Sequence, residues 1–300
     1  MPSQPYTIIE VDPEWVLEPE AMGSKDKFWY RKPEPDKVDW LFKYPQANTG
    51  QHWAEKIAAE VAAKLGIFHA VVELAIFQNV RGSATQSFAR EGRELVHGNQ
   101  ALGGKVLGYD VSATFRHSSH TMANIFLVMD DRAILTSEGA RRAKLGMAEY
   151  MVLDALIGNT DRHHENWGLL RKRTGDRWTG SLAPSFDHAS SLGRELLDEK
   201  RAQFLMENRV GSYSEKGHGG VYWSADEKRG PSPLALVRNA VRVLPEFFEP
   251  ALEKLQGVER DVLSEIIGRV PADWMTSVAR QFTLALMCYN LQELRRLLPL

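Results

Sequence analysis

The stretch that decides the fold, residues 156–170, reads LIGNTDRHHENWGLL. Apolar residues spaced three and four apart predict a helix before it, and an apolar run follows it. Between them lies a polar segment that contains Asp161 and Asn166, five residues apart. A second acid, Asp187, directly follows Phe186 and comes twenty-one residues after Asn166. These polar side chains are therefore the first candidates for a functional site.

The two acids and the amide match the minimal set that holds magnesium and ATP. When a phosphoryl group passes to a hydroxyl, one aspartate orients the acceptor, an asparagine binds metal, and a later aspartate bridges metal to phosphates. Mg²⁺ prefers hard oxygen ligands, which Asn166 and Asp187 supply. We therefore expect ATP and Mg²⁺ as cofactors, Asp161 and Asn166 as catalytic residues, and Asn166 and Asp187 as metal ligands.

Residues 159–166, NTDRHHEN, resemble the catalytic loop of HipA-like protein kinases, which reads Asn-x-Asp-Arg-His-x-x-Asn. The order differs from the His-Arg-Asp loop of eukaryotic kinases, because Arg162 and His163 follow the aspartate. The resemblance covers most of the chain. It implies an α+β, two-lobed, protein-kinase-like fold with a small antiparallel β lobe and a largely helical C-terminal lobe. It also implies an ATP- and Mg²⁺-dependent serine/threonine kinase.

Composition excludes several classes of protein. The 300 residues are 43% hydrophobic with a formal net charge of -2, so no basic field indicates direct nucleic-acid binding. The single cysteine, Cys288, fits a reducing compartment. The N-terminus lacks the pattern of a signal peptide, and no apolar run is long enough for a membrane span. We expect a cytoplasmic protein, with an effector secreted into a host cytosol as the alternative.

Residues 38–45 predict a strand that ends before a proline. Period two places Val38, Trp40 and Phe42 on one face. A kinase needs one ammonium group on such a strand to hold the phosphates, and Lys43 is the best-placed candidate. The alternative is a lysine that only extends to solvent. The sequence around Lys43 resembles the lysine strand of the family.

Residues 22–29 read MGSKDKFW, which suits a turn whose backbone N–H groups face phosphate. A turn with solvated lysines would read identically. The family resemblance implies that Gly23, Ser24 and Lys27 contact the nucleotide phosphates. It also makes Ser24 a candidate for autophosphorylation.

A helix is predicted over residues 50–66, because one apolar stripe recurs every four residues and Gly66 can close the helix. The stripe consists of Trp53, Ile57, Val61 and Leu65. Glu55 and Glu60 lie off this stripe and about 140° apart, so they cannot share a role. The resemblance assigns to Glu55 the support of the phosphate-binding lysine, whereas plain surface charge is the alternative for either acid.

Residues 71–77 and 83–88 are β-like and complete the small lobe. The resemblance implies that Gln86 to Phe88 form the hinge whose main chain binds adenine. Near residue 92 the chain should pass into the second lobe. The predicted division is therefore an N-terminal lobe over residues 1–91 and a helical C-terminal lobe over residues 92–300.

The C-terminal lobe is predicted from its periodicity. After a loop-rich stretch at 93–119, helices are expected over 122–129 and 137–157, the latter opened by Ser137. The runs 167–170 and 178–182 flank a polar turn and predict a hairpin, which explains the delay before Asp187. Residues 189–230 resemble an activation segment, with a helix-like part at 196–206 and a mobile glycine-rich loop at 209–220. From 233 onward the pattern is helical, with breaks at Pro245, Pro250, Gly257 and Pro271.

Three other interpretations remain open. Histidines near the acids, His163, His164 and His188, would suit a divalent-metal phosphoester hydrolase. Against it, adjacent histidines on a loop point in different directions. His117 and His120 lack an acid or cysteine at ligand spacing, so loop chemistry is favoured. A phosphoinositide or small-molecule kinase is the second alternative, weakened by the lack of a basic amphipathic helix. A catalytically silent binding module is the third, although the kinase residues occur together.

The family resemblance also bears on partners. HipA-like proteins include toxins that phosphorylate a translation component and are held by a small antitoxin, and effectors that act on host proteins. Little sequence precedes the phosphate loop here, so the additional N-terminal subdomain of the toxins is expected to be absent. Any antitoxin or regulator is then expected to be a separate chain. The acceptor is expected to be a protein that the sequence does not name.

Overall fold

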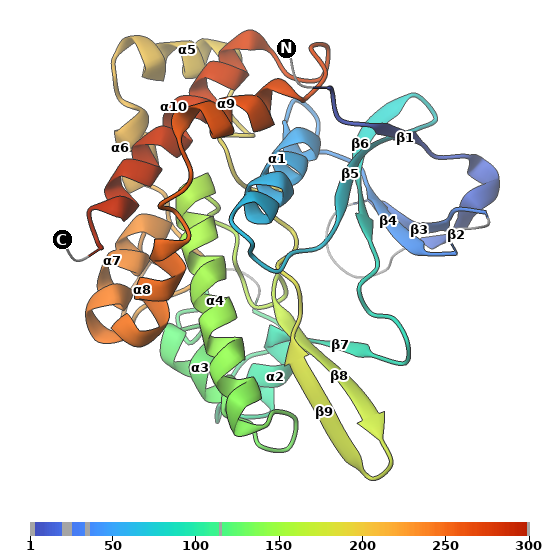
Figure 1. The fold of residues 1–300 in the computed structure, drawn as a ribbon, viewed down its shortest axis with the longest axis vertical. Helices are drawn as coiled ribbons and strands as arrows, with labels where there is room; N and C mark the ends of the chain where they lie inside the picture. The colour runs from blue at the N-terminus through green and yellow to red at the C-terminus, as the bar shows by residue number, and fades with distance from the viewer. Residues whose placement is uncertain (1–3, 20–25, 34–36, 114–115, 299–300) are drawn as a thin grey trace.

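The computed structural model describes residues 4–19, 26–33, 37–113 and 116–298, and Figure 1 shows a strand-rich part beside a helical part. The predicted α+β class is confirmed: a six-stranded sheet forms the N-terminal part, and helices dominate the rest. Within the described residues, no helix is both long and apolar enough to cross a bilayer.

The N-terminal sheet is mixed, with strand order β1-β5-β6-β4-β3-β2. Every pairing is antiparallel except that of β1 with β5, which is parallel. A short 3₁₀ turn, Pro13–Trp15, separates the first two strands. The strands are β1 (Ile8–Glu10), β2 (Val16–Pro19), β3 (Lys27–Arg31), β4 (Asp39–Lys43), β5 (Val72–Phe77) and β6 (Val80–Gln86).

Each face of this sheet has its own apolar layer. On one face, α1 (Gln51–Lys64) packs against β5 and β6, with Trp53 and Ile57 in the same buried cluster as Leu74. On the other face Phe28 stacks on Phe42 with ring centroids 5.1 Å apart. The predicted stripe on α1 is confirmed, although α1 is buried well beyond that stripe.

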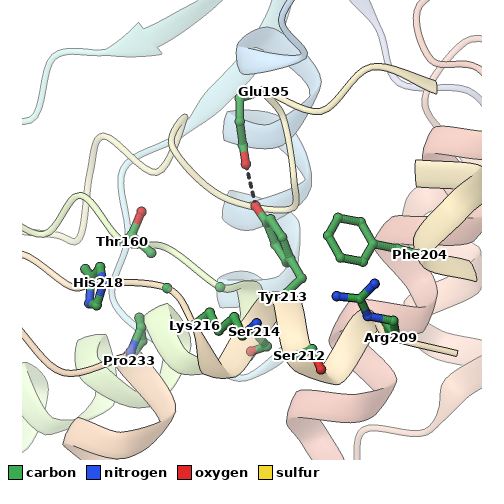
Figure 2. Close-up of a pocket in the computed structure, with 12 residues that line it drawn as sticks. Thr160, Glu195, Phe204, Arg209, Ser212, Tyr213, Ser214, Lys216, His218 and Pro233 are labelled. Atoms are coloured by element: carbon green, nitrogen blue, oxygen red, sulfur yellow. Dashed lines mark hydrogen bonds between the residues drawn. The ribbon is translucent and has the colours of Figure 1, made fainter. Parts of the chain in front are cut away.

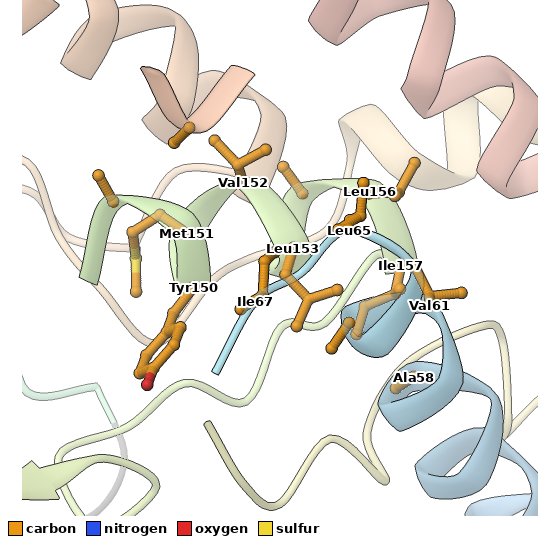
Figure 3. Packing of buried hydrophobic residues seen from close by; sticks show 14 of the residues in the cluster. Ala58, Val61, Leu65, Ile67, Tyr150, Met151, Val152, Leu153, Leu156 and Ile157 are labelled. Atoms are coloured by element: carbon orange, nitrogen blue, oxygen red, sulfur yellow. The ribbon is translucent and has the colours of Figure 1, made fainter. Parts of the chain in front are cut away.

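The C-terminal part is built around α4, which contacts α3, α7, α8 and α10. All eight residues from Tyr150 to Ile157 are buried. Figure 3 shows Leu153, Leu156 and Ile157 beside Val61, Leu65 and Ile67, so one core joins α1 to α4. The helices are α2 (Gly98–Gly103), α3 (Met122–Met129), α4 (Ser137–Ile157), α5 (Asp198–Met206), α6 (Val210–Glu215), α7 (Pro233–Val243), α8 (Pro245–Glu253), α9 (Arg260–Gly268) and α10 (Ser277–Arg295).

A second, antiparallel sheet lies where the chain passes between the two parts. Its strand order is β7 (Glu94–His97), β8 (Gly168–Thr174) and β9 (Arg177–Leu182). The predicted hairpin is confirmed as β8 and β9. Because β8 follows the polar loop and β9 precedes Asp187, the hairpin brings the two acidic segments back to the same place.

Four details differ from the sequence predictions. The stretch 93–119 contains β7 and α2, and the glycine-rich stretch 209–220 contains α6; both were missed because such short elements show little periodicity. Thr136, not Ser137, caps α4, because its hydroxyl accepts the N–H of Gly139. Pro250 lies inside α8 instead of ending it. Its missing N–H costs one hydrogen bond in a helix whose inner face is buried.

Candidate active site

The loop that carries Asp161 begins where α4 ends. Gly158 ends the helix in the left-handed conformation, at φ 66°, which glycine adopts without strain. Asn159 then fixes the exit of the chain. Its Nδ2 donates to Asp154 Oδ1 at 2.8 Å, and its Oδ1 accepts the main-chain N–H of Asp161 at 3.1 Å. Asp161 is thereby held at a defined position relative to the core helix.

Asn166 closes the same loop. Its Nδ2 donates to the main-chain oxygen of Asp161 at 2.8 Å. Since a carbonyl oxygen can only accept, this bond determines which side of the amide faces the loop. The opposite atom, Asn166 Oδ1, is then the one left to bind a cation. The five-residue spacing between Asp161 and Asn166 is thus the length of the loop that this hydrogen bond closes.

Asp187 and Lys43 meet where the two lobes join. Lys43 Nζ lies 3.3 Å from Asp187 Oδ1, with 11% of the lysine side chain exposed. Burial works against the ammonium charge, but Asp187 and Glu55 raise the pKa of Lys43. Asp187 has φ 57°, the left-handed region that is unusual outside glycine and is often found at functional sites. The structure therefore brings together two residues that the sequence places 144 positions apart.

Glu55 is fully buried behind this pair. Its Oε1 accepts the main-chain N–H of His188 at 3.0 Å. Burial alone would raise the pKa of Glu55, but the charge of Lys43 and the bond from His188 lower it, so the carboxylate is held ionised. Glu55 therefore acts on Lys43 through its charge, while the ion pair of Lys43 is with Asp187.

Arg162 joins the catalytic loop to the segment before Asp187. Its guanidinium pairs with Asp154 through two hydrogen bonds, of 2.7 and 2.8 Å. It also donates to the main-chain oxygen of Asn166 at 2.6 Å and that of Phe186 at 3.2 Å, and to Ser185 Oγ at 3.1 Å. With 2% of its surface exposed, Arg162 is a buried structural connector.

A family model described as the HipA-like C-terminal domain matches residues 20–248. The chain belongs to this HipA-like family.

Solved structures show the same fold. The crystal structure of a Helicobacter pylori proinflammatory kinase, CtkA, is similar with a TM-score of 0.74 and 17% identity, covering 90% of this chain and 93% of that one. HipA from Shewanella oneidensis, solved with HipB and operator DNA, gives a TM-score of 0.57 at 15% identity, covering 95% of this chain and 66% of that one. No curated protein matches significantly. At these identities the two structures establish the two-lobed, kinase-like fold of the HipA-like chain.

The structure of this HipA-like chain describes only part of the predicted phosphate loop. Gly23 and Ser24 lie outside the described residues. Lys27 is the first residue of β3 and lies directly opposite Lys43 in the antiparallel pairing of β3 with β4. Directly opposed residues project from the same face of a sheet. Lys27 and Lys43 therefore lie on one face at the end of the sheet nearest Asp187.

The predicted hinge leaves β6 at Gln86. The main-chain N–H of Gln86 donates to Val71 O, and that of Ser87 donates to Asp39 O, at 2.9 and 2.8 Å. Phe88 lies against Phe186, with ring centroids 5.3 Å apart. Since the first two N–H groups are used within the sheet, main-chain donors for a purine must come from Phe88 onward. Of the predicted hinge residues Gln86 to Phe88, Phe88 is the best placed.

The histidines around the loop are held by internal hydrogen bonds. Trp167 Nε1 donates to His120 Nε2 at 3.0 Å, and His120 Nδ1 lies 2.7 Å from Gly220 O. Tyr109 Oη lies 2.9 Å from His164 Nδ1. Burial lowers the pKa of His120 to about 3 and that of His164 to about 4. Both side chains are therefore neutral and hydrogen-bonded within the protein.

His188 does not support the hydrolase alternative either, because its ring is buried and hydrogen-bonded within the protein. Its Nε2 lies 2.7 Å from Ser185 Oγ, and both side chains are 1% exposed. Across the described residues, no group of three or more His, Cys, Asp or Glu is arranged to hold a metal. The oxygen pair of Asn166 and Asp187 instead suits an ion that completes its shell with water and phosphate.

One site residue was missed from the sequence. Ser190 Oγ donates to Asp161 Oδ2 at 3.0 Å, and Arg194 Nη2 lies 3.3 Å from the same hydroxyl. Ser190 therefore holds one oxygen of the Asp161 carboxylate in place. The only available signal was its place in a polar run three residues after Asp187.

Proposed function

We propose that this protein is a kinase that uses Mg²⁺ and ATP to phosphorylate a serine or threonine of another protein. The observation that carries the proposal is the arrangement of four residues from separate segments. Lys43 pairs with Asp187 at 3.3 Å, and Asn166 is bonded to the main chain of Asp161 at 2.8 Å. Family membership supports the same assignment.

Each side chain has a defined task in this proposal. Asp161 accepts the hydrogen bond of the incoming hydroxyl and takes its proton as transfer completes. Lys43 binds the phosphates as an ammonium that Glu55 helps to keep charged. Asn166 Oδ1 and the Asp187 carboxylate hold the metal. Bound Mg²⁺ neutralises charge on the phosphates and orients them for in-line attack.

The donor set fits this cofactor pair. Mg²⁺ binds through one or two protein oxygens together with phosphate oxygens and water. Asn166 presents an oxygen because its NH₂ group is already used, and Asp187 remains partly exposed, with 25% of its side chain accessible. A metal at this pair would also take Asp187 from Lys43 and leave the ammonium for phosphate.

The test is phosphotransfer from γ-labelled ATP and Mg²⁺ to the purified protein and to proteins of a cell lysate. Asp161→Ala should lower labelling by at least about a hundredfold, since positioned general bases contribute about that much. Lys172→Ala, at an exposed position of β8, is the matched control and should label normally. Release of phosphate without a labelled product, or labelling that survives in Asp161→Ala, would contradict the proposal.

We further propose that Ser24 is autophosphorylated. A phosphate there adds about 1.5 to 2 negative charges beside the ATP phosphates, which would repel them and eject the loop. Mass spectrometry of the protein incubated with Mg²⁺ and ATP should place phosphate on Ser24. A Ser24→Ala variant that retains all its phosphate would rule this site out.

The acceptor and the regulator are also proposals. HipA was solved with HipB, which supports a separate regulator chain for this protein. The family supports a protein acceptor, either a translation component or, for a secreted effector, a host protein. Identification of the lysate band labelled by the wild type and absent with Asp161→Ala would decide between them.

A further inference from the structure

A pocket of about 330 Å³ opens beside the catalytic loop. Most of its lining residues belong to the stretch of chain between Asp187 and α7. One wall is Thr160, the residue directly before Asp161, and the opposite wall comes from α6 and the residues that follow it. Figure 2 shows Thr160, His218 and Lys216 on one side of Tyr213 and Phe204 on its other side. The pocket is thus polar toward the catalytic loop, and its far side combines the rings of Tyr213 and Phe204 with Arg209.

The segment after α6 lies directly against the catalytic loop. A Cβ on Gly217 would lie 3.1 Å from Thr160 Cγ2, and one on Gly220 would lie 2.9 Å from the carbonyl carbon of Arg162. Residues 216–220 therefore lie beside the main chain that carries Asp161. A polypeptide that presents a hydroxyl to Asp161 must pass next to this segment.

One basic side chain of the pocket is not neutralised. The ammonium group of Lys216 has no hydrogen-bond or ion-pair partner in the described part of the chain, whereas Arg209, which also lines the pocket, pairs with Glu207 at 2.7 Å. At the edge of the pocket, Arg229 Nη1 lies 3.5 Å from His218 Nε2, and neither side chain has a carboxylate partner among the described residues. The acid of the pocket wall, Glu195, accepts the hydroxyl of Tyr213 at 2.7 Å.

The acid next to Lys216 in the sequence, Glu215, is paired with another residue. Glu215 precedes Lys216 but receives two bonds from Arg238, of 2.8 and 2.7 Å. It is therefore directed to α7 and does not neutralise Lys216. Lys216 and Arg229 therefore remain cations without a carboxylate partner among the described residues, in a protein whose overall formal charge is -2.

We propose that this pocket binds an anionic side chain of the acceptor protein, within a few residues of the phosphorylated hydroxyl. Lys216 and the pair of His218 and Arg229 supply charge-assisted donors, which recognise either a carboxylate or a phosphoryl group. The inference rests on the proposed kinase function and names its substrate class: serine or threonine in acidic or previously phosphorylated segments.

The test separates binding from phosphotransfer. Fluorescent thirteen-residue peptides with a central serine are prepared in three forms, flanked by glutamate, phosphoserine or lysine at positions one to four on either side. Their binding to the full chain is measured by anisotropy with Mg²⁺ and a non-hydrolysable ATP analogue. Peptides with glutamate or phosphoserine should bind at least about ten times more tightly than the lysine peptide, as expected for a hydrogen bond between charged groups.

Charge reversal then identifies the pocket. Lys216→Glu should remove the preference for anionic peptides or invert it, whereas Lys172→Glu, with the same change of net charge on exposed β8, should preserve it. Equal binding of the three peptides, or equal effects of the two variants, would overturn the inference. The glutamate and phosphoserine peptides distinguish carboxylate from phosphoryl recognition. Failure of the kinase proposal would appear separately, as no labelling from γ-labelled ATP.

Discussion

The buried residue Arg162 connects three segments of the candidate site. Its guanidinium binds Asp154 of α4, the oxygen of Asn166 and the oxygen of Phe186, which precedes Asp187. A planar group with five donors can satisfy all these acceptors at once, which an ammonium group cannot. The residue after Asp161 therefore holds the loop of Asp161 against the segment of Asp187.

Removing this arginine should destabilise the protein. Arg162→Gln leaves Asp154 buried and without its partner, which should lower the free energy of unfolding by about 3–5 kcal/mol. The double variant Asp154→Asn with Arg162→Gln removes both charges and should recover part of the loss. Urea denaturation of the three proteins measures this. A double variant no more stable than Arg162→Gln would show that the charge of Asp154 is not the cause.

His120 should make stability depend on pH. Its neutral ring accepts from Trp167, and burial lowers its pKa from 6.5 to about 3. The unfolded chain therefore binds the proton more readily, and stability present above pH 6.5 is lost as the pH falls below it. The loss at pH 5 relative to pH 8 should be about 2 kcal/mol.

The control for this pH dependence is His120→Gln, which removes the titrating group while other buried histidines continue to titrate. The difference in unfolding free energy between wild type and variant should shrink by about 2 kcal/mol between pH 8 and pH 5. Denaturation curves at both pH values measure it. A difference that does not change with pH would show that His120 is already charged in the native protein.

Asp161, Asn166 and Asp187 could be singled out as candidates because their spacing along the chain is visible in the sequence. Ser190 could not be predicted, because its bond to Asp161 depends on how the segment after Asp187 folds back. In the same way, only the structure shows that the N–H of Gln86 is used by Val71 in the sheet.

For the helices, the length of each helix determined whether it could be predicted from the sequence. The bounds of α4, Ser137–Ile157, follow from a periodic pattern maintained over its 21 residues. By contrast, α6 and α2 have six residues each and take their stability from tertiary contacts. The segment after α6 was expected to be a mobile loop, yet its glycines pack against the catalytic loop.

That contact gives a prediction for Gly220→Ala. The added Cβ would lie 2.9 Å from the carbonyl carbon of Arg162, so the segment must move away from the catalytic loop. Such overpacking costs about 1–3 kcal/mol. We expect phosphotransfer to a protein substrate to fall about tenfold, since about 1.4 kcal/mol of barrier is a factor of ten. The affinity for ATP should be unchanged, because the added Cβ meets the main chain of Arg162 and His163 and not the strand that carries Lys43.

Gly257→Ala is the matched control, because a Cβ at residue 257 meets nothing within 4 Å. It should retain both phosphotransfer and stability. Steady-state kinetics with varied ATP and a fixed substrate separate the two effects. A large change in the KM for ATP with Gly220→Ala would place the disturbance in the nucleotide site instead.

For the whole molecule, the two lobes share one core. Ala58 and Val61 of α1 belong to the same buried cluster as Leu153 and Ile157 of α4 (Figure 3). Main-chain bonds of 2.9 Å also link Phe68 and Ala70 to Ser185, two residues before Asp187. The lobes are therefore topological units of one cooperative structure.

This shared core predicts that neither 1–91 nor 92–300 folds alone. Separation exposes Val61, Leu65 and Ile67, all now at most 5% accessible. Each large apolar side chain returned to water costs about 1.5–3 kcal/mol, so these three alone approach the 5–15 kcal/mol that holds a typical domain together. Each fragment should give a poorly dispersed NMR spectrum and no cooperative melting, whereas the two fragments expressed together should associate and melt cooperatively. A cooperative transition from isolated 92–300 would show that α4 completes its core without α1.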